Sequence, residues 1–388
     1  MNIVQPGKRF AEDVAYAVSH SLDLPNLRAV VADNVARAVA DPRVAEARRI
    51  LIGGSGDSLF GAMSVVPAFR RWTGLYAEAK TAMELARYEA PLLGEGDLVI
   101  SVSNSGSSSR AREVALLAKD RGAPTVGVTG SLTGALAAQA DHVIHRPVHE
   151  VEALAPQYGR CFLNMTEYLA VLYALYAFAL ELGVARGKLD PAQKAAKLSQ
   201  IEDAILAIPA MAERLEPSIV ALADQLDGQD TIWAIGAGPS RGTAQYCAAK
   251  FHEQMPINGV ACDLEEWAHL EYFLTLNWGP RSVVMVLAPQ GNSLDRAQEM
   301  VTGINGAGGR AILVTSDAAL PFAPAFGRFD IAQPADELLS PLTFHLPAQL
   351  LVLHMAARTD VPHIPLRRHD DAWLIAKGLV RQTTEGLA

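Results

Sequence analysis

The chain has 388 residues, of which 50% are hydrophobic and 19% are charged, and its formal net charge at pH 7 is −9. This length and composition favour two domains with well-filled cores and exclude a largely disordered chain. Because Lys and Arg form no run and the net charge is negative, we expect neither nucleic acid nor an anionic membrane as a partner.

Short β-branched runs alternate with helical patterns along the chain, which is typical of parallel sheets covered by helices on both faces. In the first half the expected strands are residues 49–52, 74–78, 97–102, 124–128 and 142–145. In the second half they are residues 231–235, 259–263, 282–287, 310–314 and 329–331. A long helical connection at about residues 151–226, with a break at 183–191, joins the two halves.

The most apolar part of this connection, Tyr168 to Leu182, contains Glu181 and is too short to span a bilayer, so we expect a buried helix. The N-terminus carries no apolar core after its basic residues and does not resemble a signal peptide. The cysteines are widely spaced and lack the spacing of zinc ligands, which favours reduced thiols in a cytoplasmic protein.

The two halves of the chain share three motifs at offsets of 182 to 186 positions. The matching pairs are Gly54–Ser58 with Gly236–Ser240, Ser105–Arg110 with Gln290–Arg296, and Val126–Ser131 with Ile312–Asp317. A nearly constant offset indicates that one α/β unit was duplicated. We therefore predict an α/β fold of two tandem flavodoxin-like domains, residues 1–183 and 184–388, each with a parallel sheet between two helical layers.

The serine-rich stretch Ser103–Ser109 lies between an expected strand and an expected helix. The N-terminus of that helix offers unpaired N–H groups, the serines add hydroxyl donors, and Gly106 lets the backbone approach a ligand. These groups suit a dianionic phosphate without Lys or Arg. The alternative interpretation is an N-capped helix with a polar turn. A companion glycine turn at Gly54–Ser58, also between an expected strand and an expected helix, favours a ligand instead.

Nucleotide motifs are missing from the sequence. The turn at Gly54–Ser58 does not complete a GxGxxG pattern, and no GxxxxGK[ST] pattern occurs. We expect no nucleotide cofactor and no metal.

The pairing of a Gly-x-Gly-x-Ser turn with a Ser-x-Ser-Gly-x-Ser loop about 50 residues later resembles the sugar isomerase (SIS) domain family, in a duplicated form that covers roughly residues 28–377. That family includes the isomerase half of glucosamine-6-phosphate synthases, fructosamine-6-phosphate deglycases and amino-sugar-phosphate deaminases. The resemblance implies that a sugar phosphate is bound by Ser103, Asn104, Ser105, Ser108, Gly56 and Ser58. Asp57 departs from the small neutral or hydroxyl residue of many relatives, which leaves sugar recognition there open.

The catalytic resemblance lies in the second half, where Glu253 precedes His269 by 16 residues and Glu266 lies three residues before the histidine. The resemblance implies that Glu253 is the base that moves a proton between C1 and C2 of an open-chain sugar phosphate. It also implies that His269 assists ring opening; both roles suit the chemistry of these side chains. A solvated helix carboxylate and a packed or surface histidine are the structural alternatives.

The resemblance extends to the assembly and to the C-terminal tail. In relatives the histidine reaches into the site of a neighbouring subunit, which implies a homodimer with shared active sites. Lys377 is the counterpart of a lysine that closes over the sugar, although a surface lysine is an equal alternative. The absence of a cysteine near the N-terminus leads us to expect no glutamine-hydrolysing domain.

The sequence thus predicts a cytoplasmic enzyme that deglycates, deaminates or isomerises a sugar phosphate or amino-sugar phosphate through an enediol or enolamine. Plain aldose–ketose isomerisation, as in phosphoglucose/phosphomannose isomerases, is the enzymatic alternative. A non-catalytic sugar-phosphate sensor is the alternative from another class.

Overall fold

The computed structural model describes residues 9–154, 160–255, 257–316, 321, 325–331 and 336–358. Their contacts divide them into two compact units. The first-sheet unit holds residues 19–150 and 166–199, and the second-sheet unit holds residues 9–18, 151–165 and the described residues from 200 onward. The predicted division was a single cut after residue 183, whereas the structure groups the N-terminal residues with the second sheet.

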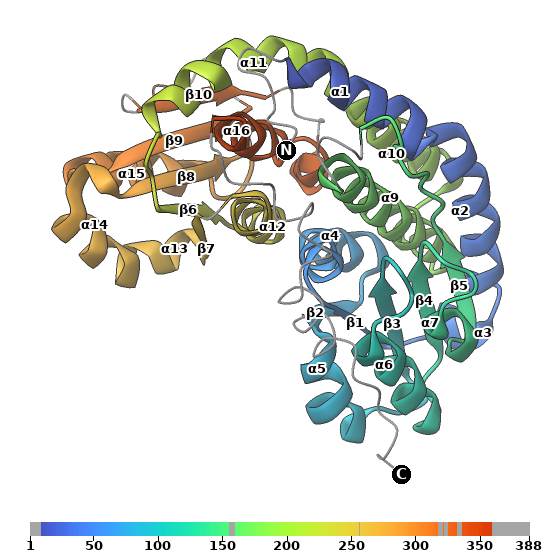
Figure 1. Ribbon diagram of the computed structural model, residues 1–388. Helices are drawn as coiled ribbons and strands as arrows, with labels where there is room; N and C mark the ends of the chain where they lie inside the picture. The colour runs from blue at the N-terminus through green and yellow to red at the C-terminus, as the bar shows by residue number, and fades with distance from the viewer. Residues whose placement is uncertain are drawn as a thin grey trace. The chain divides into compact units, whose positions relative to one another are not determined.

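The first-sheet unit is built on five parallel strands in the order β2-β1-β3-β4-β5 (Figure 1). These are β1 (Arg49–Gly54), β2 (Tyr76–Thr81), β3 (Asp97–Ser103), β4 (Thr125–Thr129) and β5 (His142–His145). The unit's helices are α2 (Leu24–Val39), α3 (Pro42–Ala45), α4 (Asp57–Thr73), α5 (Ala82–Glu84), α6 (Ser109–Asp120) and α7 (Ala135–Gln139). This is the flavodoxin-like strand order. The chain places β2 on one side of β1 and then continues with β3 on the other side, so the order of the strands reverses between β1 and β3.

The central strand β3 explains why this sheet is covered on both faces. All seven residues of Asp97-Leu-Val-Ile-Ser-Val-Ser103 are buried, and the run Leu98–Ile100 is apolar without alternation, as expected for a strand covered on both faces. Helix α6 follows it directly and buries Ala111, Val114, Ala115 and Ala118 at helical spacing.

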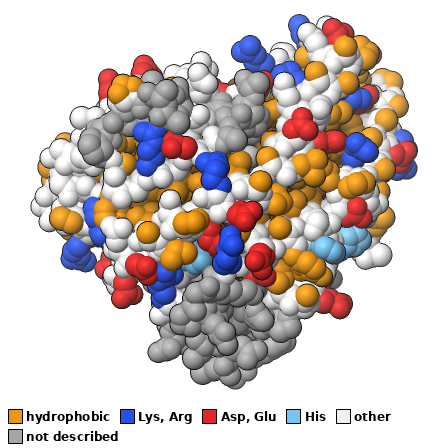
Figure 2. All heavy atoms as spheres, turned by 90° about the horizontal axis from the view of Figure 1, so that it is seen from above, with side chains coloured by type: hydrophobic (Ala, Val, Ile, Leu, Met, Phe, Trp, Pro, Cys, Tyr) orange, Lys and Arg blue, Asp and Glu red, His pale blue; other side chains and the backbone are white. Residues whose placement is uncertain are grey.

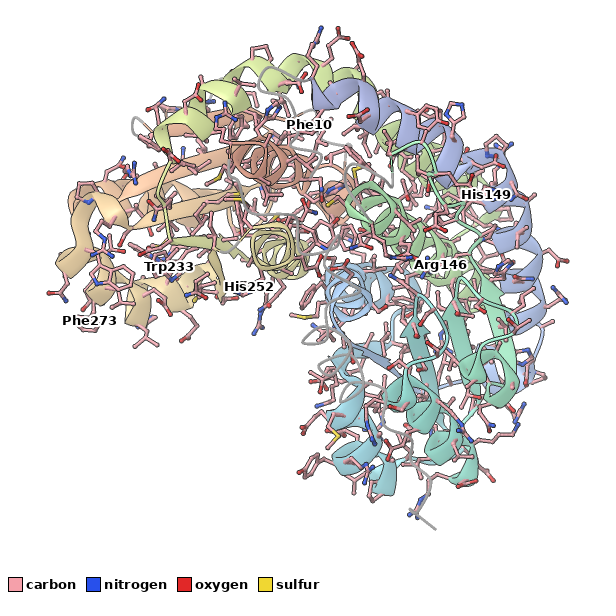
Figure 3. The ribbon with its side chains drawn as sticks, in the orientation of Figure 1. Phe10, Arg146, His149, Trp233, His252 and Phe273 are labelled. Atoms are coloured by element: carbon pink, nitrogen blue, oxygen red, sulfur yellow. The ribbon has the colours of Figure 1, made fainter. Side chains whose placement is uncertain are left out.

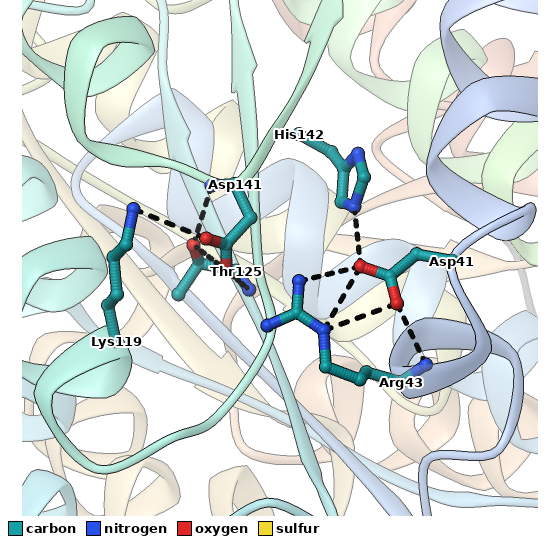
Figure 4. A network of polar contacts seen from close by, with 6 residues as sticks. All are labelled: Asp41, Arg43, Lys119, Thr125, Asp141 and His142. Atoms are coloured by element: carbon teal, nitrogen blue, oxygen red, sulfur yellow. Dashed lines mark hydrogen bonds and ion pairs between the residues drawn. The ribbon is translucent and has the colours of Figure 1, made fainter.

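Two carboxylates, Asp41 and Asp141, make hydrogen bonds at the β5 edge of this sheet (Figure 4). Asp41 accepts hydrogen bonds from the backbone N–H and the side chain of Arg43, and Nε2 of His142 lies 2.9 Å from Asp41 Oδ2. These bonds hold the pKa of Asp41 well below its usual value, with the Arg43 side chain as the main cause. Asp141 accepts from the backbone N–H and the hydroxyl of Thr125, at 3.0 and 3.1 Å, and so joins β4 to the start of β5.

The second-sheet unit repeats this topology, with strand order β10-β9-β8-β6-β7 and parallel pairing throughout. Its strands are β6 (Thr231–Gly236), β7 (Asn258–Asp263), β8 (Val283–Ala288), β9 (Arg310–Thr315) and β10 (Gly327–Asp330). Its helices include α1 (Phe10–Ala17), α11 (Ile208–Gln225), α12 (Pro239–Gln254), α13 (Leu264–Glu266), α14 (Tyr272–Trp278), α15 (Leu294–Gly306) and α16 (Leu346–Ala356). The predicted duplication is therefore visible as two sheets of the same strand order.

Helix α1 joins the second-sheet unit through a buried carboxylate on α11. Glu216 accepts hydrogen bonds from the backbone N–H groups of Phe10 and Ala11, the latter at 3.2 Å, and its Oε1 lies 3.0 Å from Nε2 of His354 on α16. A carboxylate at a helix N-terminus satisfies N–H groups that otherwise have no acceptor. This local bonding explains why the start of the chain groups with its second half.

The long connection consists of α9 (Cys161–Ala185), α10 (Pro191–Leu206) and α11, with its predicted break between α9 and α10. Among the described residues, two helical segments are long and apolar enough to cross a membrane, Cys161–Ala185 and Glu337–Ala356. In the most apolar windows of these segments 83% and 94% of the residues are buried, as in core helices. The stretch Tyr168–Leu182 is a buried part of α9, as predicted, within a helix longer than expected.

Candidate functional site

The carboxyl ends of β1 and β3 bring together the two motifs that sequence analysis singled out. Gly53 of β1 pairs in register with Ser101 of β3, so the glycine turn after β1 and the serine loop after β3 leave the sheet side by side. We call residues 103–108 the serine loop. Ligands of doubly wound sheets bind outside the carboxyl ends of the strands, at this point where the strand order reverses.

The serine loop is closed by its own backbone and presents hydroxyl groups outward. Gly106 has φ +64°, and its N–H donates to the carbonyl of Ser103 at 3.2 Å. Ser103 is buried at the end of β3, whereas Ser105 and Ser107 are exposed with their hydroxyl oxygens 2.8 Å apart.

Ser108 is the N-cap residue of α6, yet its side chain makes no capping hydrogen bond to any described residue. The simple N-cap interpretation of the loop is thus not supported at this position. The first turn of a helix has N–H groups without intrahelical acceptors, and such groups bind phosphate at other helix N-termini.

The glycine turn begins α4. Gly56 has φ +55° and is exposed, while Ser58 in the first turn of the helix is buried with 5% of its surface exposed. Of the predicted binding residues in this turn, Gly56 thus faces solvent and Ser58 does not.

Asn104 lies between two charged groups of the first-sheet unit. Its Nδ2 donates to Oε2 of Glu167 on α9 at 3.3 Å, and its Oδ1 accepts from Nη2 of Arg146. Arg146 follows β5 and is fully buried, and burial lowers the pKa of its guanidinium to about 10 (Figure 3). Sequence analysis missed Arg146, because a lone arginine in an irregular segment gives no periodic signal.

In the second-sheet unit, Glu253 lies in the last turn of α12. Nζ of Lys250 donates to Oε2 of Glu253 at 2.7 Å. Lys250 is fully buried, whereas 41% of the Glu253 side chain is exposed. The Lys250 ammonium also lies 4.5 Å from the centre of the Tyr246 ring. The carboxylate is therefore held by a buried cation and open on its other side; sequence analysis did not single out Lys250.

His269 lies at the other end of the second sheet, in the single π-helical turn Trp267–Glu271. Its side chain is 65% exposed and its Nε2 lies 3.2 Å from Oε1 of Glu265, four residues earlier. Glu265 in turn binds Arg296 at 2.6 Å, whereas Glu266, the residue expected beside the histidine, is exposed.

Strand β7 separates Glu253 from His269 within this unit. Glu253 precedes the strand's first residue, Asn258, and His269 follows its last, Asp263. The six residues of β7 span roughly 17 Å at ~3.3 Å per residue. One copy of the second-sheet unit therefore does not bring the two predicted catalytic side chains into contact.

Other candidates do not add to the described site. Lys377 and the tail around it lie outside the described residues. Burial raises the pKa of the Cys161 and Cys247 thiols to about 12 and that of Cys262 to about 11. All three thiols are free and stay protonated near neutral pH, so none is an activated nucleophile.

On the face drawn in Figure 2, Lys and Arg side chains are interspersed with Asp and Glu rather than gathered in one basic patch. The positive groups beside the site residues, Arg146 and Lys250, are instead buried.

Comparison with known proteins agrees with this architecture. Residues 43–179 match the family model for the SIS domain. The chain is 25% identical over 309 residues to the isomerizing glutamine–fructose-6-phosphate aminotransferase of Caulobacter vibrioides, covering 79% of this chain and 49% of that protein. It is 26% identical over 328 residues to the protein of the same name from Thermococcus kodakarensis, covering 83% and 51%. The chain spans about half the length of these curated relatives.

Solved structures share the fold at low sequence identity. The C-terminal domain of glucosamine-fructose-6-phosphate aminotransferase from Francisella tularensis aligns with a TM-score of 0.73 at 17% identity, covering 90% of this chain and 96% of that one. Tagatose-6-phosphate ketose/aldose isomerase from Escherichia coli aligns at 0.67 and 14% identity, covering 93% and 97%. Residues 43–179 therefore match the SIS domain, and the chain carries a second parallel sheet of the same strand order.

Proposed function

We propose that the chain is an enzyme that binds a sugar phosphate at the serine loop and transfers a proton between neighbouring carbon atoms of the open-chain sugar. The observation that carries this proposal is the convergence of the glycine turn and the serine loop at the point where the strand order reverses. The exposed hydroxyls of Ser105 and Ser107 and the uncapped start of α6 suit the oxygens of a phosphate.

In this proposal Ser103, Ser105, Ser108 and Asn104 form the phosphate site, and Gly56 and Ser58 lie toward the sugar. Glu253 is the base, and the buried ammonium of Lys250 holds its carboxylate in place. Removing a proton from carbon requires a correctly placed base, and phosphate binding away from the reacting carbons supplies that placement. His269 would open the sugar ring, and Lys377 would close over the bound sugar.

The reaction class is proposed from the relatives. The curated relatives carry names of isomerizing aminotransferases, and one structural neighbour at a TM-score of 0.58 is a glucosamine-6-phosphate deaminase from Thermotoga maritima. These names support C–N chemistry at C1 or C2, meaning deglycation or deamination. Plain aldose–ketose isomerisation is the second candidate, which the likeness to a ketose/aldose isomerase supports. A sensor without turnover is the third.

A homodimer with shared active sites is part of the proposal. His269 is exposed and stands beside a group of exposed apolar side chains, Leu270, Phe273, Leu274 and Leu276. An exposed apolar group of this kind favours a protein–protein contact, and a second copy would bring His269 to a site that its own unit does not reach. The free thiols agree with a cytoplasmic location.

The test is turnover of a panel of hexose and amino-sugar 6-phosphates, with free ammonia, released amine and ketose or aldose measured in parallel. We expect Glu253→Gln to bind the active sugar phosphate with an affinity near that of the parent protein and to lose turnover by at least about a hundredfold. Release of ammonia or amine identifies C–N chemistry, and ketose formation alone identifies isomerisation.

The matched control is Glu213→Gln, which removes an exposed carboxylate from the same unit outside the predicted site. If Glu253→Gln and Glu213→Gln retain equal turnover, Glu253 is not the base. If no sugar phosphate is turned over but several stabilise the folded protein against heat, the sensor replaces the enzyme.

A further inference from the structure

The guanidinium of Arg146 is a buried positive group that is hydrogen-bonded to a residue of the serine loop. The residue has no exposed surface, and its backbone N–H donates to the carbonyl of Thr129 at the end of β4, at 3.0 Å. Nη2 donates to Oδ1 of Asn104, and Nη1 lies 3.5 Å from the backbone carbonyl oxygen of Glu167. The side-chain amide of Asn104 therefore connects the charged guanidinium to the serine loop.

Asn104 is held on three sides. Its backbone carbonyl accepts from the N–H of Gly130 at 3.0 Å, its Oδ1 accepts from Arg146, and its Nδ2 donates to Glu167. Only one orientation of the amide places the oxygen on the cation and the nitrogen on the carboxylate. The middle of the serine loop is thus locked to the ends of β4 and β5 and to α9.

The charge of Arg146 is incompletely compensated. Within the described residues, no carboxylate lies within ion-pair distance of its nitrogens, and its buried Nε has no hydrogen-bond acceptor. Glu167 attracts Arg146 electrostatically from beyond ion-pair distance, and it is bonded to it through the Asn104 side chain and the long backbone contact. A buried cation without a paired anion is unfavourable, and an anion seated on the loop would compensate it.

We propose that Arg146 is a positioning residue that orients Asn104 and supplies the buried charge by which the serine loop selects a dianion over a neutral group. This inference rests on the proposed function, because it concerns the same phosphate site. It identifies the source of anion selectivity in a chain whose net charge is −9. Glu167 opposes Arg146, so the two residues set the potential at the loop together.

The experiment compares Arg146→Gln with Glu167→Gln, with each variant titrated against inorganic phosphate, fructose 6-phosphate and fructose. Arg146→Gln removes the cation and should weaken binding of both phosphate ligands by about tenfold, which is ~1.4 kcal/mol, with little change for fructose. Glu167→Gln keeps an acceptor for Asn104 but removes the opposing charge, so it should strengthen phosphate binding. A purely structural brace would instead be loosened by both variants, and both would then bind phosphate more weakly.

The controls are Arg37→Gln and Asp33→Asn, which change the net charge equally at an exposed ion pair of the same unit. Arg146→Lys retains the charge without the planar fork and should recover part of the affinity lost in Arg146→Gln. If Arg146→Gln does not fold, tighter phosphate binding by Glu167→Gln than by Asp33→Asn still supports the inference, and equal binding by those two overturns it.

A separate variant distinguishes this inference from the proposed function. If Ser105→Ala combined with Ser108→Ala leaves phosphate binding unchanged, the loop is not an anion site and both proposals fail. If the double variant weakens phosphate binding while Arg146→Gln behaves like Arg37→Gln, the proposed function stands and the role of Arg146 is wrong.

Discussion

Gly106 provides a quantitative test of the serine loop's conformation. Its φ of +64° lies in the left-handed region, where an L-residue is disfavoured by about 1–2 kcal/mol. A Cβ added at this position would also lie 2.9 Å from Oγ1 of Thr129 and 3.3 Å from Cα of Gly134. Crowding of this kind in a packed region costs about 1–3 kcal/mol. Gly106→Ala should therefore lower the free energy of unfolding by about 2–5 kcal/mol in total.

Gly187 is the matched control, because it has φ +67°, lies in the same unit, and would bring its Cβ within 4 Å of no described atom. Gly187→Ala should show only the conformational part, about 1–2 kcal/mol. Urea unfolding of both variants gives the difference from the midpoints and slopes, and phosphate binding should fall in Gly106→Ala alone. Equal destabilisation would mean that the loop relaxes around the methyl group, and the close packing assigned to it would be wrong.

Three further predictions concern the second-sheet unit. Burial lowers the pKa of His345 from 6.5 to about 4. As the pH falls, the unfolded chain therefore takes up the proton first, and roughly 3 kcal/mol of stability is lost between pH 6.5 and about pH 4. Denaturant midpoints measured against pH should therefore fall less steeply in His345→Gln, and equal slopes would contradict this. Glu216→Ala leaves the N–H groups of Phe10 and Ala11 without their acceptor, which should cost about 2–4 kcal/mol and speed proteolysis within α1. Unchanged cleavage would show that packing alone holds the helix. Lys250→Met removes the buried cation that binds Glu253, so turnover should fall at least about tenfold. Retained turnover would show that Glu253 acts without Lys250.

The fold was predictable because its strands carry strong local signals. All ten predicted strands overlap strands of the structure, and the edge strand β5 has the predicted bounds His142–His145. The repeated glycine turns then implied that the two sheets share one topology. The place of α1 was not predictable, because the side chain that binds it, Glu216, lies about 200 residues away on a helix whose other acidic residues look the same.

The candidate site was predictable only where it is local in sequence. The serine loop and the glycine turn are contiguous motifs, and a parallel sheet of this order brings them together. Arg146 was missed because an isolated arginine is usually exposed, whereas this one is buried and contacts the Glu167 carbonyl on α9. His269 matched a spacing, yet its bonded partner is Glu265, which depends on the local π-helical turn.

The negative net charge indicated that an anion would be held by local groups rather than by a basic surface, and the serine loop suited phosphate without requiring Lys or Arg. In the structure each copy of the duplicated unit carries a fully buried cation bonded to a predicted site residue, Arg146 to Asn104 and Lys250 to Glu253. A buried charge is screened much less by water and salt than an exposed one, so it acts more strongly on a neighbouring group. The local charge at such a position therefore depends on which side chains the fold buries, and the composition of the chain does not reveal it.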